Sequence, residues 1–391
     1  MVVQLDGGMD WFTRNIEMQV AVEGVDVRDE GEFFSVPWSA YDGYSALFDI
    51  GRPIRGKITL ICPPEYSAWI GGVTVTVEET VHFLDIFTSV DICKTEIQVG
   101  EPTWLNSSIE YEFSIALNQI ADQFKSKWHE SYNGETFGLR HTLICSIIRP
   151  WYILFNDPVY KSLKLYSIDT PTSNSDVFRE YILEIREVTR LCQLILPTQW
   201  VRPGHPLYLR LVIEELEKPI DYAQINFFKS EYVEEQWTDV VLGAFKVCGP
   251  DNIEDAEEPE EEVDGSRSVM VISKRVDDGD PEPRPTDGIR KGTTMEMQIM
   301  LDPTLAVSFD TCSLGLQSKY DNTPENNVLH KDAVALRYFL RLIVIDCDGD
   351  SFWNTVELFV HRTEKPDFLE EREIGSAVAV STKRISMSNV V

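Results

Sequence analysis

The sequence predicts an all-β protein made of two tandem antiparallel β-sandwiches, with an acidic disordered loop in the second. Three observations support this fold class. Apolar and polar residues alternate along many short stretches, turn signals separate these stretches, and regular helical segments do not lie between them. This pattern is typical of sheets that have one buried and one solvated face and that stack in pairs.

The alternation is clearest in five stretches. In each, every second residue is apolar and most intervening residues are polar, so each is expected to form a strand with one face in the core. One amphipathic helix is expected at 116–124, because Leu117, Ile120 and Phe124 share a helical face. The alternating stretches are 16–22, 73–78, 109–115, 295–299 and 336–344.

Two changes in composition divide the chain. A polar linker occupies residues 169–175, and residues 251–288 contain 14 acidic and 4 basic residues together with four prolines. Self-repulsion and a shortage of large apolar side chains predict that 251–288 is a solvated loop. We therefore expect an N-terminal sandwich at 10–168, a C-terminal sandwich at 177–362 that contains the acidic insert, and a flexible tail at 363–391.

The two halves of the chain share three similar stretches in the same order. An Arg-Pro segment comes first, an alternating strand follows, and a longer strand that begins near an arginine comes last. The shared order indicates two units of one design, the second interrupted by the acidic insert. The matching stretches are 51–60 with 201–209, 109–115 with 294–299, and 139–147 with 336–344.

Charge and cysteine usage limit the classes of function. The chain has 35 basic and 65 acidic residues, a net charge of -30, so it repels nucleic-acid phosphates and anionic lipids at long range. We expect no nucleic-acid binding, and membrane attachment only through partners. No signal peptide or membrane-spanning run is expected. The 7 cysteines are widely spaced, which favours a reducing compartment where each thiol packs as a small apolar group.

Motifs for catalysis are not evident in the sequence. The 6 histidines lack metal-ligand spacing, and no phosphate-binding glycine loop or nucleophile elbow occurs. We therefore expect no enzymatic activity, no catalytic or metal-binding residues and no cofactor. His141 lies on the apolar side of an alternating strand and is predicted to be a core or interface histidine rather than a ligand.

The acidic spacing of a calcium loop occurs after one of the strands. Ser351 stands where such a loop needs glycine, and alternating strands rather than helices flank it. Asp348-Gly349 between two strands is a strong hairpin signal, so a hairpin is predicted here rather than a calcium site. The residues with this spacing are Asp346, Asp348, Asp350 and Glu357.

Two charged features each leave two interpretations open. Arg337 and Arg341 share the strand face opposite the apolar residues, and they form either a solvated basic face or a contact with another domain or an acidic partner. The acidic insert at 251–288 is either a solvating spacer or a regulatory segment that competes with acidic ligands for a basic groove.

Motifs in the first half carry a resemblance to a known family. They are an aromatic-rich strand that contains Tyr-Glu-Phe at 111–113, a Ser-Tyr-Asn-Gly turn at 131–134 and a long strand that begins near Leu-Arg at 139–140. Together these resemble the first domain of arrestin-fold proteins.

The second half is similar to one branch of that family, the arrestin-like subunit of retromer. Asp-Gly at 287–288 precedes Lys-Gly at 291–292, and Leu-Arg-Tyr-Phe-Leu occupies 336–340. A closing strand at 352–362 also fits. The resemblance covers roughly residues 10–362 without the acidic insert.

The resemblance implies a non-enzymatic adaptor subunit in the cytoplasm, peripheral on the endosome membrane. Such a subunit bridges an α-solenoid scaffold, a sorting nexin and cargo cytoplasmic tails during sorting from endosomes to the Golgi or in recycling. Cargo is added as an extra strand at a sheet edge. By position, the scaffold-binding residues are Pro285, Thr286, Asp287 and Gly288, and the cargo- or sorting-nexin-binding residues are Val334 and Leu336.

Two alternatives remain open at this stage. Another arrestin-like trafficking adaptor, which recruits receptor tails or a ubiquitin ligase, is favoured by the Pro-Pro-Glu-Tyr motif at 63–66. A metal-dependent enzyme on a sandwich would require histidines and carboxylates to cluster in space.

Overall fold

The computed structural model divides the chain into two units. Unit 1 comprises Met1–Ser167 and Phe368–Val391, and unit 2 comprises Ile168–Asp367. The structure describes residues 16–28, 44–62, 67–84, 88–117, 128–149, 158–168, 180–185, 192–213, 220–233, 236–247, 253–255, 269–276, 293–311, 334–346, 348–365 and 371–373.

The fold is all-β, as predicted. Every regular element within the ranges just given, apart from a single 3₁₀ residue at Leu117, is a strand or turn. In those ranges no helix is long and apolar enough to cross a membrane. The helix expected at 116–124 lies outside the described residues from position 118 onward.

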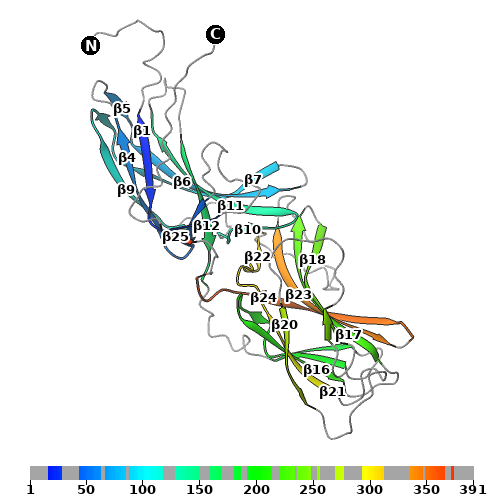
Figure 1. Ribbon diagram of the computed structural model, residues 1–391. Helices are drawn as coiled ribbons and strands as arrows, with labels where there is room; N and C mark the ends of the chain where they lie inside the picture. The colour runs from blue at the N-terminus through cyan, green and yellow to red at the C-terminus, as the bar shows by residue number, and fades with distance from the viewer. Residues whose placement is uncertain are drawn as a thin grey trace. The chain divides into compact units, whose positions relative to one another are not determined.

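The described strands of unit 1 form three sheets, and Figure 1 labels most of these strands. The first has the order β1-β4-β9, the second has the order β25-β2-β3-β12-β11-β6-β7 with β10 beside β11, and β5 pairs with β8. The strands are β1 (Glu17–Val22), β2 (Val25–Arg28), β3 (Tyr44–Asp49), β4 (Ile54–Ile61), β5 (Ala68–Ile70), β6 (Val73–Phe83), β7 (Thr88–Val99), β8 (Thr103–Leu105), β9 (Ile109–Ile115), β10 (Tyr132–Asn133), β11 (Phe137–Ile147), β12 (Val159–Tyr166) and β25 (Glu371–Glu373).

The two larger sheets of unit 1 share one hydrophobic core. Val20 of β1 and Ile58 of β4 pack in the same cluster as Val75 of β6 and Leu143 of β11. These residues occupy alternate positions along their strands, so the period of two in the sequence becomes one buried face per sheet. Unit 1 is therefore a β-sandwich.

In unit 2, the strands that the structure describes form two sheets. One has the order β13-β14-β16-β21-β20, and the other has the order β15-β24-β23-β17-β18-β19 with β22 beside β23. The strands are β13 (Tyr181–Ile185), β14 (Cys192–Leu196), β15 (Trp200–Val201), β16 (Pro206–Ile213), β17 (Ile220–Val233), β18 (Gln236–Val247), β19 (Ile253–Asp255), β20 (Val269–Val276), β21 (Thr293–Met300), β22 (Phe309–Asp310), β23 (Ala335–Asp346) and β24 (Ser351–Val360).

The sheets of unit 2 also bury one alternating set of residues each. Leu209 and Leu211 of β16 are buried on one sheet, and Leu340 and Leu342 of β23 on the other. The amide of Asn354 on β24 donates to a β13 carbonyl across 2.8 Å, so the two sheets are in contact.

Two strand pairs are parallel, which the prediction of antiparallel sheets did not include. They are β3 with β12 and β15 with β24. Parallel neighbours need a long connection, and in both pairs the partners lie more than a hundred residues apart in the chain. The local pattern of alternation is the same for either direction, so it cannot distinguish them.

Strands also occur in two stretches that were predicted to lack them. β19 and β20 lie within 251–288, and β25 lies within the expected tail at 363–391, where it pairs with β2. The charge in the insert is unevenly distributed: residues 269–273 read Val-Met-Val-Ile-Ser and have strong β propensity. An average over the whole stretch concealed this short apolar run.

The described cysteines match the prediction that each thiol packs as a small apolar group. Cys62, Cys93, Cys145 and Cys192 are buried and form no disulfide. Burial raises the pKa of the Cys145 and Cys192 thiols to about 12. These two thiols therefore stay protonated near neutral pH and are poor nucleophiles.

Candidate functional site

Val334 and Leu336, the residues predicted to bind cargo or a sorting nexin, lie at the start of β23. Val334 immediately precedes the strand and Leu336 is its second residue. Both side chains are 0% exposed. Neither side chain therefore presents an open surface to a ligand in this structure.

At this point β23 has a strand on each side. Leu336 pairs with Glu231 of β17 and with Phe309 of β22. β17 is a long strand that pairs with β23 almost throughout, whereas β22 has only two residues. At the start of β23, one edge is thus held by the long ladder with β17 and the other by the two residues of β22. From Tyr338 onward, that second edge pairs with β24.

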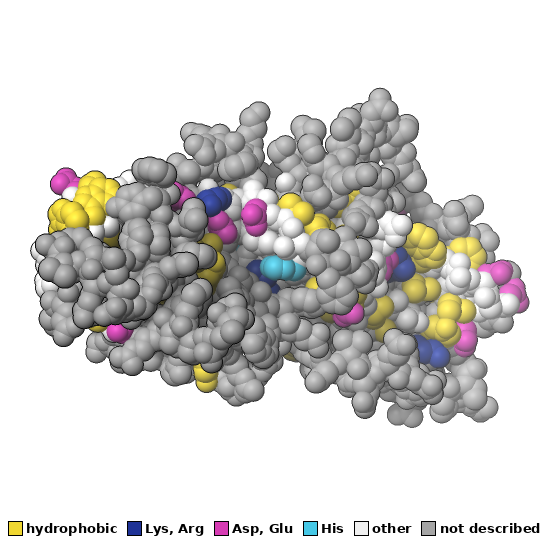
Figure 2. All heavy atoms as spheres, turned by 90° about the horizontal axis from the view of Figure 1, so that it is seen from above, with side chains coloured by type: hydrophobic (Ala, Val, Ile, Leu, Met, Phe, Trp, Pro, Cys, Tyr) yellow, Lys and Arg dark blue, Asp and Glu magenta, His cyan; other side chains and the backbone are white. Residues whose placement is uncertain are grey.

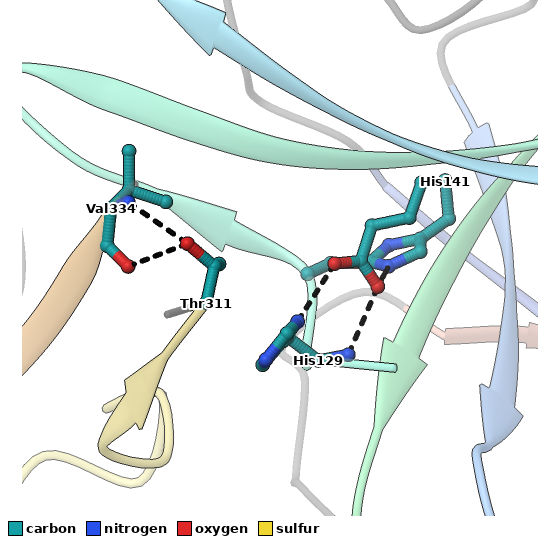
Figure 3. A network of polar contacts seen from close by, with 6 residues as sticks. His129, His141, Thr311 and Val334 are labelled. Carbon is teal, nitrogen blue, oxygen red and sulfur yellow. Dashed lines mark hydrogen bonds and ion pairs between the residues drawn. The ribbon is translucent and has the colours of Figure 1, made fainter. Parts of the chain in front are cut away.

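Thr311 extends the contact of β22 by one residue. Its backbone N–H donates to the carbonyl of Val334 across 3.0 Å. Its hydroxyl accepts from the N–H of Val334 at 2.9 Å and donates to the carbonyl of the same residue at 3.0 Å (Figure 3). Thr311 therefore satisfies both backbone polar groups of Val334, as an added strand would.

The segment that leads into β22 has further anchors. The hydroxyl of Tyr338 donates to the carbonyl of Ala306 across 3.0 Å. Ser308 and Val360 of β24 exchange two hydrogen bonds, at 3.2 and 3.1 Å. Together with Thr311, these bonds position residues 306–311 along the start of β23.

A buried ion pair lies next to the same site. Lys229 Nζ is 2.9 Å from a carboxylate oxygen of Glu231, and the two side chains are 13% and 0% exposed. Glu231 is the β17 partner of Leu336. Removing one member of such a pair leaves an uncompensated charge in the core, so the β17 side of the site is rigidly specified.

The two arginines of β23 differ in their surroundings. The side chain of Arg337 is 14% exposed, and its guanidinium lies 3.7 Å from both Asp310 and Glu357. The guanidinium of Arg341 lies 4.8 Å from the ring centroid of Phe228 and 5.1 Å from that of Trp353. The solvated interpretation is wrong for Arg337, which is held within unit 2.

A second polar cluster lies in unit 1, around Glu79 of β6. Glu79 and His141 are cross-strand partners on β6 and β11, and His141 Nε2 lies 3.2 Å from Glu79 Oε2. The backbone N–H of His129 donates to Oε2 across 3.0 Å, and His129 Nδ1 lies 2.8 Å from Oε1. Both histidines thus converge on one buried carboxylate (Figure 3).

The cluster continues to the neighbouring strand through Ser131. Its hydroxyl oxygen lies 2.9 Å from His141 Nδ1 and accepts from the N–H of Leu165 on β12 across 2.8 Å. An ionised carboxylate only accepts, so His141 donates from Nε2 to Glu79, and its Nδ1 is hydrogen-bonded to the Ser131 hydroxyl. The resulting chain of hydrogen bonds joins β6, β11, β12 and the segment before β10.

Opposing effects set the ionisation of Glu79. Burial raises the pKa of Glu79. Hydrogen bonds and charge from His129 and His141 lower it by more, so the pKa lies at about 2. Glu79 is therefore ionised at neutral pH although its side chain is 0% exposed.

No protein-family model matches this chain, and no curated protein matches it. The geometry of the two clusters therefore has to support any functional conclusion, together with the resemblance of the motifs.

The hydrogen-bonded series Ser131–His141–Glu79 has the connectivity of a nucleophile, a base and an acid. Its geometry instead indicates that it joins strands within the core. The Ser131 hydroxyl already accepts from Leu165, and the Ser131 N–H donates to the Leu165 carbonyl across 2.9 Å. His141 and Glu79 are 0% exposed, so these hydrogen-bonded side chains are closed off from a substrate in solvent. His141 is a core histidine, as predicted.

The sequence contained a signal for Glu79 that the alternation pattern did not use. Glu79 continues the inward series Val73, Val75 and Val77. A carboxylate at an inward position requires a buried partner, and His141 occupies an inward position of another strand. The contribution of His129 had no such signal, because it comes from a segment without periodicity.

The acidic turn after β23 is a hairpin, as predicted. Asp346 Oδ1 accepts from the N–H groups of Asp348 and Asp350, each across 3.0 Å. Gly349 has a φ of 86°, the left-handed conformation that this turn requires. The Asp346 carboxylate is thus directed at the backbone of the turn. Within the described ranges, no group of three or more His, Cys, Asp or Glu is placed to hold a metal ion.

Two predicted motifs lie outside the described residues. These are the scaffold-binding residues Pro285, Thr286, Asp287 and Gly288, and the Pro-Pro-Glu-Tyr motif at 63–66. Both remain predictions.

Proposed function

We propose that this chain is a retromer-type adaptor subunit that binds other proteins by β-strand addition at the start of β23. The observation that carries the proposal is that a two-residue strand and one threonine occupy this edge. A strand of only two residues can be exchanged for a segment of another protein with the same backbone pairing, provided that the anchors at Ala306 and Ser308 are also released.

The exchange would conserve the backbone hydrogen bonds of Val334 and Leu336. An incoming extended segment would pair with the backbone of Val334 and Leu336 where Thr311 and Phe309 pair now. The long ladder between β23 and β17 would stay intact. Because Val334 is buried, specificity would come from backbone register and from the pocket that Phe309 leaves.

Partners follow from the same proposal. The segment that adds to β23 would be a cargo tail presented with a sorting nexin, and an α-solenoid scaffold would bind at 285–288. The protein would be cytoplasmic and recruited to the endosome membrane by these partners, without catalysis. Its net charge of -30 supports indirect attachment, since it repels anionic lipids.

Thr311→Val tests the strand exchange. It removes the hydroxyl that bonds both polar groups of Val334 but keeps the shape of the side chain. Losing these bonds should weaken the contact of β22 by roughly 1–2 kcal/mol. Amide hydrogen exchange at 309–311 and 334–336 should then accelerate about tenfold, and a labelled peptide with the sequence of residues 305–311 should bind more tightly.

Thr238→Val is the matched control, because Thr238 is an exposed threonine of β18 in the same sheet. Unchanged exchange and peptide binding in Thr311→Val relative to this control would contradict strand exchange. Retromer membership has a separate test, co-elution of the full chain with purified retromer scaffold subunit in size-exclusion chromatography. Separate elution would contradict it.

A further inference from the structure

The outer face of the second sheet of unit 2 combines aromatic rings with basic side chains. This outer face is the side of β17, β18, β23 and β24 that carries Phe228, Val241, Arg341 and Trp353. Trp353 and Val241 are 58% and 55% exposed. Phe228 is 2% exposed, with the Arg341 guanidinium 4.8 Å from its ring centroid. Exposed apolar side chains that lie together on one face indicate a binding surface. Figure 2 shows that, on the side of the molecule it draws, apolar and basic side chains reach the surface close to one another.

Two cations of the outer face lie over rings. Lys246 Nζ is 4.1 Å from the ring centroid of Tyr222, and the Arg341 guanidinium lies between Phe228 and Trp353. Cation–π contacts thus hold the positive charges of Lys246 and Arg341 against aromatic rings. In a protein with a net charge of -30, they offer local attraction to an acidic ligand that the whole molecule repels.

The carboxylates on the outer face have partners of their own. Asp239 accepts a hydrogen bond from Ser230, and Glu357 lies 3.7 Å from Arg337. Lys246 Nζ, by contrast, lies over an aromatic ring, that of Tyr222. Arg341 Nε donates to Thr355 Oγ1 across 3.2 Å, and a guanidinium carries several N–H donors. Lys246 and Arg341 are the cations of this face to which we expect an added carboxylate to bind.

The chain itself supplies an acidic segment beside the outer face. β19 pairs with β18, and Glu254 and Asp255 stand at the register positions of Lys246 and Phe245. Residues 256–264 follow directly, and six of these nine are acidic. This run is consequently tethered at the edge of the sheet that presents the cations.

Residues 256–264 are long enough to reach from β19 to β23. Neighbouring strands lie about 4.8 Å apart, so β23 is about 14 Å from β19 across three strand spacings. Nine extended residues span about 30 Å. A tether of this length holds its ligand at an effective concentration on the order of millimolar, which compensates for weak individual contacts.

We propose that the outer face is a docking surface for acidic peptide segments, and that the chain's own residues 256–264 are its occupant. Acidic segments of other proteins would compete with this intramolecular ligand for Lys246, Arg341 and Trp353. The inference does not depend on strand exchange at β23, since it concerns the opposite side of the sheet from Leu336 and Leu340.

A labelled peptide with the sequence of residues 256–264 tests the proposal by fluorescence anisotropy on the full chain. One variant replaces Glu257, Glu258, Glu260 and Glu261 with Gln. Its matched control changes the net charge equally at the far end of the insert, with Asp277→Asn, Asp278→Asn, Asp280→Asn and Glu282→Gln. The first variant should bind the peptide at least ~10-fold more tightly than the wild type or the control, because its own segment no longer competes.

Lys246→Gln in the background of the first variant should reduce that binding, and added salt should weaken it. Equal affinity for wild type, variant and control would mean that the outer face is open to acidic partners but not occupied by residues 256–264, and would overturn the assignment. Absence of peptide binding, or binding unaffected by Lys246→Gln, would overturn the surface itself.

Discussion

At the scale of single residues, the two adjacent glutamates of β6 show how strand geometry decides the role of a charge. Glu79 is buried among His129 and His141. Glu78 is on the other face, where it pairs with Lys94 across 2.8 Å and is partly exposed. A glutamate is thus the acceptor at the middle of a buried network at position 79 and half of a surface ion pair at position 78, because successive residues of a strand point to opposite faces.

Glu79→Gln should destabilise the protein strongly. The amide would keep the size of the side chain but would replace one carboxylate oxygen with an NH2 group, which faces a histidine donor and removes the negative charge. Breaking a buried charge network of this kind costs about 3 kcal/mol or more. Urea unfolding followed by circular dichroism would measure the loss. Glu78→Gln is the control and should cost less than about 1 kcal/mol, because its ion pair is exposed to solvent.

The pH dependence has a definite sign. The pKa of Glu79 is about 2 in the folded protein against an ordinary value of 4.5. A lowered pKa means that folding favours the ionised form, so this stabilisation is fully present above the ordinary value. It is lost as the pH falls from there toward the folded value. The stability difference between wild type and Glu79→Gln should therefore narrow from about pH 5 to about pH 3, and a constant difference would contradict this role.

The residue scale also shows the limits of prediction from sequence. The burial of His141 was predictable, because the residue lies on the apolar side of a regular alternation. The pairing of Glu79 with His129 was not, because 50 residues separate them and His129 lies outside any strand. Periodicity predicts which side chains are buried but not which polar groups meet.

At the scale of elements, the small sheet β1-β4-β9 depends on a glycine in its central strand. Gly56 pairs with Val22 on one side and Phe113 on the other. A Cβ built at Gly56 would lie 2.4 Å from the carbonyl oxygen of Ala21 and 2.5 Å from the ring of Phe113. The aromatic ring thus covers the position that a side chain would otherwise fill.

Gly56→Ala should therefore distort this sheet. Either the Phe113 ring or the β1 backbone must shift, and overpacking of this kind costs about 1–3 kcal/mol. Gly138→Ala in β11 is the control, because its nearest contact would be an ordinary 3.4 Å. Thermal unfolding of both variants would measure the difference, and equal melting temperatures would refute the packing argument.

Long and short elements differ in how well the sequence predicted them. The alternating stretches at 109–115 and 336–344 appear as β9 and as the body of β23, because seven or more residues suffice to establish a period of two. β22 was missed, since two residues carry no periodicity. The occupied edge at Val334 was therefore not predictable, although the importance of β23 was.

At the scale of the whole molecule, the acidic insert combines structure with charge. It contributes β19 to one sheet of unit 2 and β20 to the other. The strongly acidic residues 256–264 lie between these two strands. Two segments of the insert, β19 and β20, are thus strands of the sheets of unit 2.

Replacing segments of the insert by a Gly-Ser linker of equal length should separate these roles. Replacing 269–276 removes one of the two partners of β21, leaving β16. It should lower the melting temperature by several degrees, since about 1 kcal/mol corresponds to roughly 2–4 °C in a unit of this size. Replacing 256–264 should change stability by no more than about 1 kcal/mol. Thermal unfolding would compare the two, and the reverse order would show that the acidic run has the larger structural role.

The pairing of β25 with β2 has a consequence for biosynthesis. Unit 1 receives its last strand, Glu371–Glu373, from beyond the end of unit 2. A ribosome therefore releases every residue of unit 2 before the sheet of unit 1 can be completed. The open edge of β2 remains available to cellular chaperones throughout that interval.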